Sequence, residues 1–112
     1  MVNNICGVYK ITNVVNGKFY IGSSNNIKHR WYQHKINLND EIYGNTHLQN
    51  AWKLYGEENF KFEIIGECTP AMQFEREQYY LDTLNPFEGR GYNIVRRISK
   101  EYMSDNYWES NI

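Results

Sequence analysis

Two short stretches near the start of the chain alternate between hydrophobic and polar residues and are separated by a turn signal. Residues 5–12 and 19–23 each have the pattern of a β-strand. The Asn16-Gly17 dipeptide between them is typical of a tight hairpin turn. The sequence therefore predicts an N-terminal β-hairpin.

The turn sets which residues of this hairpin face each other. A loop of even length centred on the turn dipeptide would pair Asn13 with Tyr20 and, two steps along, Ile11 with Gly22. Tyr9 would lie on the same face, with its Cα atom roughly 13 Å from that of Tyr20. A bulge or a longer loop would be needed to bring the two hydroxyls together. Gly22 would leave this face bare, so that a side chain or a ligand could approach the backbone.

Helical periodicity follows the hairpin. The hydrophobic spacing predicts a helix over residues 27–38, with Asn25 or Asn26 as its N-cap. A second helix is predicted over residues 46–55, and Gly56 ends it. After it, a segment beginning at Phe60 and running to residue 66 alternates and then becomes apolar, which indicates a third strand.

A third helix is predicted between two proline signals. Thr69 before Pro70 is a cap residue followed by proline at the first helical position, and Asn85 before Pro86 ends the helix. Residues 92–95 read as a short extended piece. The predicted fold class is α+β in the order ββααβα, with a small three-stranded, mainly antiparallel sheet flanked by helices.

The chain length of 112 residues suits one domain, which we place at residues 1–95 ahead of a short tail at 96–112. Hydrophobic residues make up 41% and charged residues 22%, which are ordinary globular values. No apolar run approaches the ~18 residues of a membrane span, and no secretory leader pattern is present at the N-terminus. These features predict a soluble, intracellular, cytoplasmic protein.

The net charge of -1 is unevenly distributed. The first 56 residues hold six Lys and Arg against two acids, whereas the remainder holds six against eleven. The basic half, including residues 28–35, could face a polyanion, although a solvated charged helix explains that segment about as well. The two cysteines, Cys6 and Cys68, form no CxxC or zinc-finger pattern, so we expect reduced core cysteines.

Polar side chains interrupt the apolar stripe of the first predicted helix. His34 falls in a stripe with Ile27, Trp31 and Leu38, and Arg30 lies beside it. Both basic side chains are therefore expected on the inward side of the helix. A satisfied core histidine would be the structural explanation for position 34.

The third predicted helix has a carboxylate in its stripe. Glu77 lies among Phe74, Leu81 and Leu84, so it should be more buried than Glu75 and should need a partner. A half-buried salt bridge with the arginine at position 30 would be a structural explanation. The alternative is convergence in one layer interface, where five side chains would line one concave surface: Tyr9, Tyr20, Arg30, His34 and Glu77.

This set of side chains suits phosphodiester hydrolysis by in-line attack, with one metal at the leaving oxygen. Glu77 can bind Mg²⁺ when phosphate and water complete the shell. Arg30 suits a phosphate oxygen, and Tyr20 and His34 can donate to developing negative charge. Tyr9 could deprotonate water, although its phenolate costs ~4 kcal/mol at pH 7. A nearby metal and a guanidinium would reduce that cost.

The sequence motifs resemble the GIY-YIG nuclease domain over about residues 5–95, most closely the catalytic domains of phage intron-encoded and free-standing homing endonucleases. The matching motifs are Gly7-Val8-Tyr9, Tyr20-Ile21-Gly22, Arg30 and His34 in the next helix, Glu77, and Gly91-Tyr92-Asn93-Ile94. The resemblance implies an Mg²⁺-dependent DNA endonuclease, with Mn²⁺ as a substitute, acting in the host cell of a phage, virus or mobile element.

The same resemblance implies a role for each site residue. Tyr9 would be the general base, and the side chains that contact the scissile phosphate and the nucleophile would be Tyr20, Arg30 and His34. Glu77 would hold the single metal ion. Asn93 would support the site.

Two departures bear on DNA binding. Some relatives carry a histidine where this chain has Tyr43, for which His47 is either a substitute or a plain surface residue. Homing endonucleases of this type also have a long DNA-binding extension. We expect this chain to bind DNA weakly and non-specifically by itself, through Lys18, Lys28 and Lys35 with His47; a separate DNA-binding domain or a protein partner is possible. The alternative is a non-catalytic module that binds nucleic acid or protein, which the net charge favours.

Overall fold

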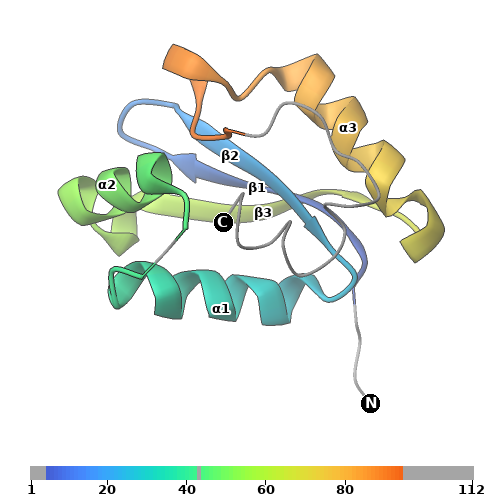
Figure 1. Ribbon diagram of the computed structural model, residues 1–112, viewed down its shortest axis with the longest axis horizontal. Coiled ribbons are helices and arrows are strands. Elements are labelled where there is room, and N and C mark those ends of the chain that lie inside the picture. The colour runs from blue at the N-terminus through green and yellow to red at the C-terminus, as the bar shows by residue number, and fades with distance from the viewer. Residues whose placement is uncertain (1–4, 43, 95–112) are drawn as a thin grey trace.

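The computed structural model describes residues 5–42 and 44–94, and its elements run in the predicted order (Figure 1). The strands are β1 (Gly7–Asn13), β2 (Phe19–Ser24) and β3 (Phe60–Glu67), and the α-helices are α1 (Ile27–Asn39), α2 (Thr46–Tyr55) and α3 (Gln73–Leu84). Three 3₁₀ turns complete the described elements: η1 (Glu57–Asn59), η2 (Pro70–Met72) and η3 (Glu88–Arg90). The α+β class and the order ββααβα are confirmed. The tail at 96–112 lies outside the described residues.

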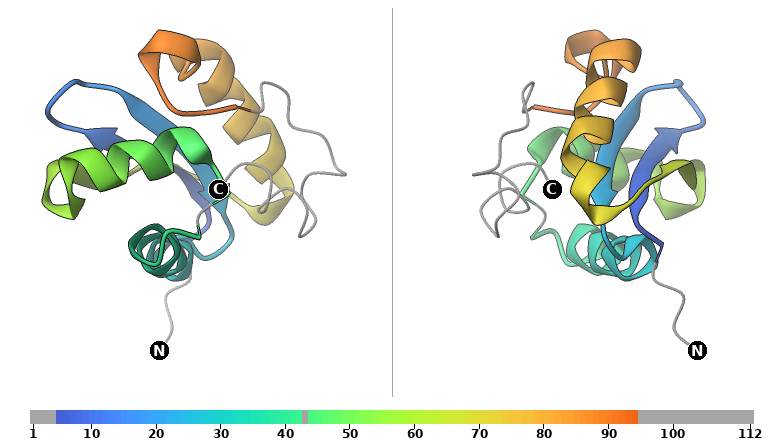
Figure 2. Two further views of the ribbon diagram at one scale, coloured as in Figure 1. Left: turned by 60° about the vertical axis from the view of Figure 1, so that its left-hand side comes forward. Right: turned by 90° about the vertical axis from the view of Figure 1, so that its right-hand side faces the viewer.

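The three strands form one antiparallel sheet in the order β2-β1-β3, so β2 is an edge strand. Helices α1 and α2 cover one face and α3 covers the other (Figures 1 and 2). The apolar core is accordingly split in two. The α1 and α2 side includes Tyr9, Ile11, Tyr20, Leu48 and Trp52, and the α3 side comprises Val8, Ile21, Leu81 and Phe87. Within the described ranges, no helix is long and apolar enough to cross a membrane.

The hairpin register differs from the prediction by two residues. Tyr9 faces Gly22 and Ile11 faces Tyr20, whereas the turn dipeptide had suggested that Ile11 would face Gly22. The backbone N–H of Asn13 donates to the carbonyl of residue 18, so the loop spans residues 14–17. Its centre therefore lies between residues 15 and 16, whereas the prediction had placed it between residues 16 and 17. This longer loop makes the two tyrosines diagonal cross-strand neighbours, with Cα atoms roughly 7 to 8 Å apart.

Local signals account for the limits of α1 and α2. The Asn26 side chain accepts from the backbone N–H of His29 and starts α1, and Asn45 does the same for Leu48 at the start of α2. Helix α2 ends at Gly56, whose φ of 88° suits glycine. The predicted helices over 27–38 and 46–55 are therefore confirmed to within one residue.

The start of α3 differs from the prediction. Thr69 makes no capping hydrogen bond, and Pro70 opens the 3₁₀ turn η2, after which the α-helix begins at Gln73. At its C-terminal end, Asn85 adopts the left-handed conformation. Instead of the expected extended piece at 92–95, a single parallel bridge joins Gly91 to β2, and residue 95 lies outside the described part.

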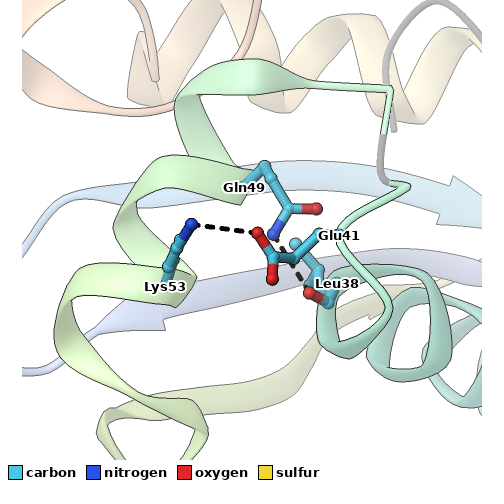
Figure 3. A network of polar contacts seen from close by, with 4 residues as sticks. All are labelled: Leu38, Glu41, Gln49 and Lys53. Carbon is cyan, nitrogen blue, oxygen red and sulfur yellow. Dashed lines mark hydrogen bonds and ion pairs between the residues drawn. The ribbon is translucent and has the colours of Figure 1, made fainter.

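Polar contacts join the end of α1 to α2 (Figure 3). The Gln49 side chain donates to the backbone carbonyl of Leu38 at 3.0 Å, and Lys53 pairs with Glu41 at 3.0 Å. Both members of the ion pair are exposed, so it contributes at most about 1 kcal/mol. These contacts hold α2 against α1.

Candidate active site

The centre of the candidate site is a hydrogen bond between β1 and α1. The hydroxyl of Tyr9 lies 2.5 Å from Nε2 of His34, and both side chains are fully buried. Tyr9 reaches this position by lying over Gly22, because a Cβ atom at Gly22 would come within 2.5 Å of the Tyr9 hydroxyl oxygen. The bare face predicted at Gly22 is confirmed, and the side chain that uses it is Tyr9.

Burial keeps this pair neutral. It raises the pKa of Tyr9 further above its ordinary value, an effect that Arg30 opposes and Glu77 reinforces. Burial, with a smaller contribution from Arg30, lowers the pKa of His34 to about 3. Both groups are therefore uncharged near pH 7, and the tautomer of His34 decides which of the two donates in this hydrogen bond.

Tyr20 and Arg30 flank this pair. The Tyr20 ring meets the His34 ring edge-on, with centroids 6.0 Å apart, and Tyr20 is fully buried. Arg30 lies one turn before His34 on α1 and is half-buried. Its charge acts on the pKa of both Tyr9 and His34. The structure thus brings these four predicted residues together on the α1 side of the sheet.

Glu77 comes from the opposite side of the sheet. The Ser23 hydroxyl donates to Oε1 of Glu77, and Nε2 of Gln73 donates to Oγ of Ser23 at 3.0 Å. Ser23 faces Val8, which belongs to the cluster under α3. The expectation that Glu77 and the tyrosines point into one layer interface is therefore wrong, because α1 and α3 pack on opposite faces.

Glu77 still influences the Tyr9 hydroxyl, since its charge raises the pKa of Tyr9. The two approach each other at β2, where Tyr9 lies over Gly22 and Glu77 bonds to the next residue, Ser23. Because β2 is an edge strand, groups from the two faces can meet around it. The glycine is what allows this approach from the tyrosine side.

The concave surface that the five side chains were expected to line stays a prediction. Four of the five are completely buried: Tyr9, Tyr20, His34 and Glu77. Arg30 is half-buried and is the member of the set nearest to solvent. The expected contrast within α3 is confirmed, since Glu75 is exposed and Glu77 is buried.

Sequence reasoning missed Ser23 and Gln73. Both are buried; the Ser23 hydroxyl donates to the Glu77 carboxylate, and Gln73 donates to Ser23. A signal for Ser23 was present, because strand alternation puts it on the face opposite Tyr20 and Gly22. Gln73 lies one turn before Glu77, so helical spacing also placed it on the same stripe.

Asn93 binds the edge strand in place of a further strand. Its Oδ1 accepts from the backbone N–H of Ile21 at 2.7 Å, and its Nδ2 donates to the carbonyl of Ile21 at 2.8 Å. Ile21 lies between Tyr20 and Gly22, so Asn93 holds the backbone that carries both. The supporting role implied for Asn93 stays a prediction.

Two further asparagines anchor the segment before Asn93. Asn45, which caps α2, donates from Nδ2 to the carbonyl of Tyr92 at 2.8 Å, and Asn13 donates to the Tyr92 hydroxyl at 3.2 Å. Both asparagines are fully buried. Neither was singled out from the sequence, where asparagine near a turn or a helix start has a local explanation.

The predicted DNA-binding residues are spread over several elements. Lys18 is half-buried at the hairpin end, whereas Lys28 on α1 and His47 on α2 are exposed. Lys35 is exposed on α1, and its Nζ lies 4.9 Å from the centroid of the Phe62 ring on β3. Lys35 is thus placed toward the edge of the sheet opposite β2.

A metal would have few protein ligands here. Among the described residues, no group of three or more His, Cys, Asp or Glu side chains could hold a metal ion. Glu77 offers carboxylate oxygens, the ligand type that Mg²⁺ prefers. Mg²⁺ is often held by one or two carboxylates when substrate phosphate and water supply the rest, so the donor set fits this metal.

Comparison with known proteins identifies the family. Residues 5–93 match the GIY-YIG catalytic domain. The chain belongs to the GIY-YIG family. Intron-associated endonuclease 1 of Enterobacteria phage T4 is 31% identical to it over 91 residues, which is 80% of this chain and 36% of that protein. This GIY-YIG chain therefore spans about a third of the length of its curated relative.

Two solved structures share the GIY-YIG fold seen here. A glutamate-to-alanine mutant of the catalytic domain of intron endonuclease I-TevI has a TM-score of 0.74 at 29% identity, covering 82% of this chain and 95% of that one. The catalytic domain of homing endonuclease I-TevI has a TM-score of 0.72 at 29% identity, covering 80% and 98%. The predicted resemblance and fold are confirmed, and these relatives are all endonucleases.

Proposed function

We propose that this chain is the nuclease domain of a DNA endonuclease and that Tyr9 is its general base. The observation that carries the proposal is the buried hydrogen bond between Tyr9 and His34, on which the charges of Arg30 and Glu77 both act. A buried tyrosine bonded to a neutral histidine has both a proton to give and a place to send it. The endonuclease names of its relatives support the same reaction class.

The hydrogen bond offers a route around the high pKa of Tyr9. A preformed phenolate would be costly, because burial raises that pKa. If Tyr9 passes its proton to Nε2 of His34 while taking one from the attacking water, no free phenolate is needed. The negative charge of a bound phosphate would raise the pKa of His34 and favour this transfer.

Arg30 and Tyr20 would stabilise the phosphate. A guanidinium presents a fork of donors that matches two phosphate oxygens, and Arg30 is the site residue nearest to solvent. The Tyr20 ring packs edge-on against His34, and its hydroxyl can donate to charge developing during attack. Both would act more strongly at this largely buried site than in water.

Glu77 would hold Mg²⁺, or Mn²⁺ as a substitute. The Ser23 hydroxyl donates to Oε1 of Glu77 and would orient the carboxylate. Gln73 donates to Ser23 and would orient its hydroxyl in turn. When bound, the metal would supply charge stabilisation for the leaving oxygen. Ser23 and Gln73 are then the residues that keep the carboxylate in position.

We further propose that the domain binds DNA weakly and non-specifically and acts in the host cell of a phage, virus or mobile element. The chain spans about a third of the length of its phage relative, so about two thirds of that protein lies outside the match. This length difference supports the proposal that a separate DNA-binding domain or a protein partner assists the nuclease domain. Affinity for duplex DNA is expected at about 10⁻⁴ to 10⁻⁶ M at physiological salt and should fall steeply as salt rises. Tight, salt-insensitive binding in a mobility-shift titration would contradict this expectation.

The net charge of -1 favours a second candidate, a non-catalytic module that binds nucleic acid or protein. A plasmid-nicking assay with Mg²⁺ or with EDTA separates the two. We expect nicking by the parent chain in Mg²⁺, loss of nicking in EDTA, and loss in Tyr9→Phe. The control is Tyr79→Phe, which alters an exposed tyrosine of α3 and should nick like the parent. Mg²⁺-independent nicking, or none at all, would overturn the proposal.

A further inference from the structure

The two cysteines of this chain are neighbours at one end of the sheet. Gly7 and Glu67 are the last paired residues of β1 and β3, and the next pair in that register is Cys6 with Cys68. The backbone N–H of Cys68 donates to the carbonyl of Cys6 at 3.0 Å, which continues the ladder by one step. The expected core placement is wrong, since both cysteines are half-buried, and both are free.

The spacing of such a pair suits a disulfide. Hydrogen-bonded partners in an antiparallel ladder have Cα atoms about 5.5 Å apart. Disulfide-bonded cysteines usually have Cα atoms roughly 4.4 to 6.8 Å apart. Directly opposed residues also point to the same face of a sheet.

Cys6 is connected to the candidate site by side-chain contacts. Its Sγ donates to Oε1 of Gln73 at 3.9 Å, Nε2 of Gln73 donates to Ser23 at 3.0 Å, and Ser23 donates to Glu77. The Cys6 thiol is therefore linked to the Glu77 carboxylate through two intervening side chains, those of Gln73 and Ser23. Oxidation of Cys6 would remove that donor, because a disulfide sulfur carries no hydrogen.

We propose that Cys6 and Cys68 form a reversible disulfide that alters the contacts of Gln73 and thereby the position of the Glu77 carboxylate. The oxidant is a low-molecular-weight disulfide such as oxidised glutathione. One cysteine thiolate attacks a sulfur of the oxidant and releases one thiolate of it. The second cysteine thiolate attacks the resulting mixed disulfide and releases the other. The two cysteines lose two protons and two electrons, and the oxidant becomes two thiols.

Both cysteines are free thiols in this structure. Burial, the charge of Cys68 and its hydrogen bond raise the pKa of Cys6 to about 11. Since the thiolate is the reacting form, oxidation should become faster as the pH rises.

Thiol counting tests the covalent step. The parent chain is equilibrated in glutathione buffers of increasing oxidation, quenched, alkylated and weighed intact by mass spectrometry. Because the chain has only two cysteines, an intramolecular disulfide removes both alkylation sites without an adduct or a dimer. We expect the parent to lose both alkylation sites and to regain them in dithiothreitol. Cys68→Ser should form no intramolecular disulfide. Two free thiols at every ratio, or only glutathione adducts and dimers, would overturn the proposal.

The link to Gln73 has its own readout. Oxidation should shift the Gln73 side-chain amide resonances in ¹⁵N NMR spectra of the parent, whereas those of Cys68→Ser should not move. Unchanged Gln73 resonances in a fully oxidised parent would overturn the link between the disulfide and Gln73.

The effect of oxidation on activity rests on the proposed function. We expect oxidation to slow nicking about tenfold, as loss of an outer-shell partner typically does, and Cys68→Ser to be insensitive.

The two proposals fail in different ways. A reduced parent that never nicks DNA overturns the nuclease proposal, while the thiol count and the Gln73 resonances still decide the disulfide. A parent that nicks at the same rate in both redox states, with the disulfide formed, overturns the link to the carboxylate.

Discussion

The Tyr9 hydroxyl and Nε2 of His34 lie 2.5 Å apart in a pair that is wholly buried. Burial pushes both groups toward their neutral forms, raising the pKa of the phenol and lowering that of the imidazole. The hydrogen bond therefore joins a neutral phenol to a neutral imidazole. It ties β1 to α1 and supplies the proton path in the proposed reaction.

Removing the Tyr9 hydroxyl should stop cleavage without unfolding the domain. Phenylalanine at position 9 keeps the ring over Gly22 but removes the partner that Nε2 of His34 has in the Tyr9 hydroxyl. We expect a stability loss of about 1 to 3 kcal/mol from the loss of this buried hydrogen bond, and nicking below detection. Urea unfolding and plasmid nicking measure the two effects. A Tyr9→Phe variant that nicks normally would exclude the base role.

His34 should make the protein sensitive to acid. Its pKa is about 3 in the folded state and about 6.5 when unfolded, so the unfolded chain binds the extra proton between these values. The contribution of His34 to the free energy of unfolding is therefore complete above about pH 6.5 and is lost as the pH falls toward 3. One such group contributes a slope of at most about 1.4 kcal/mol per pH unit.

Urea unfolding between pH 4 and pH 7 measures this slope. In His34→Gln the slope should become smaller, because the titrating group is gone. His47→Gln is the matched control, since His47 is exposed on α2 and its loss should leave the slope unchanged. Equal slopes in the parent and in His34→Gln would contradict the argument.

Tyr9 predicts the opposite dependence at alkaline pH. Its folded pKa is raised above the unfolded value of about 10, so the unfolded chain loses the proton first. Stability from this group is complete below about pH 10 and falls as the pH rises further. Tyr9→Phe should flatten this alkaline decline relative to Tyr79→Phe.

Replacing Glu77 by glutamine should separate metal binding from folding. Glutamine keeps an oxygen that can accept from Ser23 but removes the charge. We expect nicking to fall by at least about 10² to 10³-fold, the size of effect seen when a stabilising group is lost. The melting temperature should stay close to that of the parent. Normal nicking in Mg²⁺ would rule out the metal role.

Glu75→Gln is the matched control for this change, since Glu75 is exposed on the same helix. It should nick and melt like the parent. If Glu77→Gln instead loses activity only through unfolding, the carboxylate is a structural partner in a buried ion pair, whose loss typically costs about 3 to 5 kcal/mol.

Gly22 should tolerate no side chain. An alanine Cβ would lie 2.5 Å from both Cζ and the hydroxyl oxygen of Tyr9, and the buried ring has little room to yield. We expect Gly22→Ala to cost about 1 to 3 kcal/mol through overpacking and to reduce nicking by displacing Tyr9. Gly89→Ala is the control, because no atom lies within 4 Å of its added Cβ. Parent-like stability and nicking in Gly22→Ala would show that Tyr9 does not depend on this glycine.

Strand alternation identified the shared face of the hairpin even though the register was wrong. A shift of two residues leaves every side chain on the same face, so Tyr9, Tyr20 and Gly22 stay together in either register. The turn dipeptide at 16–17 indicated that a turn was present but not how long the loop was. Gly17 adopts a positive φ of 79° at the last loop position, not at the centre of a two-residue turn.

The layer that each helix covers could not be predicted in the same way. The stripe containing Glu77 shows that α3 has a buried face, but a stripe carries no information about which side of the sheet it meets. That choice placed Glu77 against Ser23 and not among the tyrosines.

The sequence by itself determined the element order, the limits of α1 and α2 and the family, because these depend on residues that are close along the chain. Only the tertiary structure decided which distant groups meet. The Tyr9 to His34 bond joins residues 25 positions apart, the Ser23 to Glu77 bond joins residues 54 apart, and Asn93 reaches back 72 positions to Ile21. Such contacts depend on how layers pack and on where a loop ends, which local periodicity does not encode.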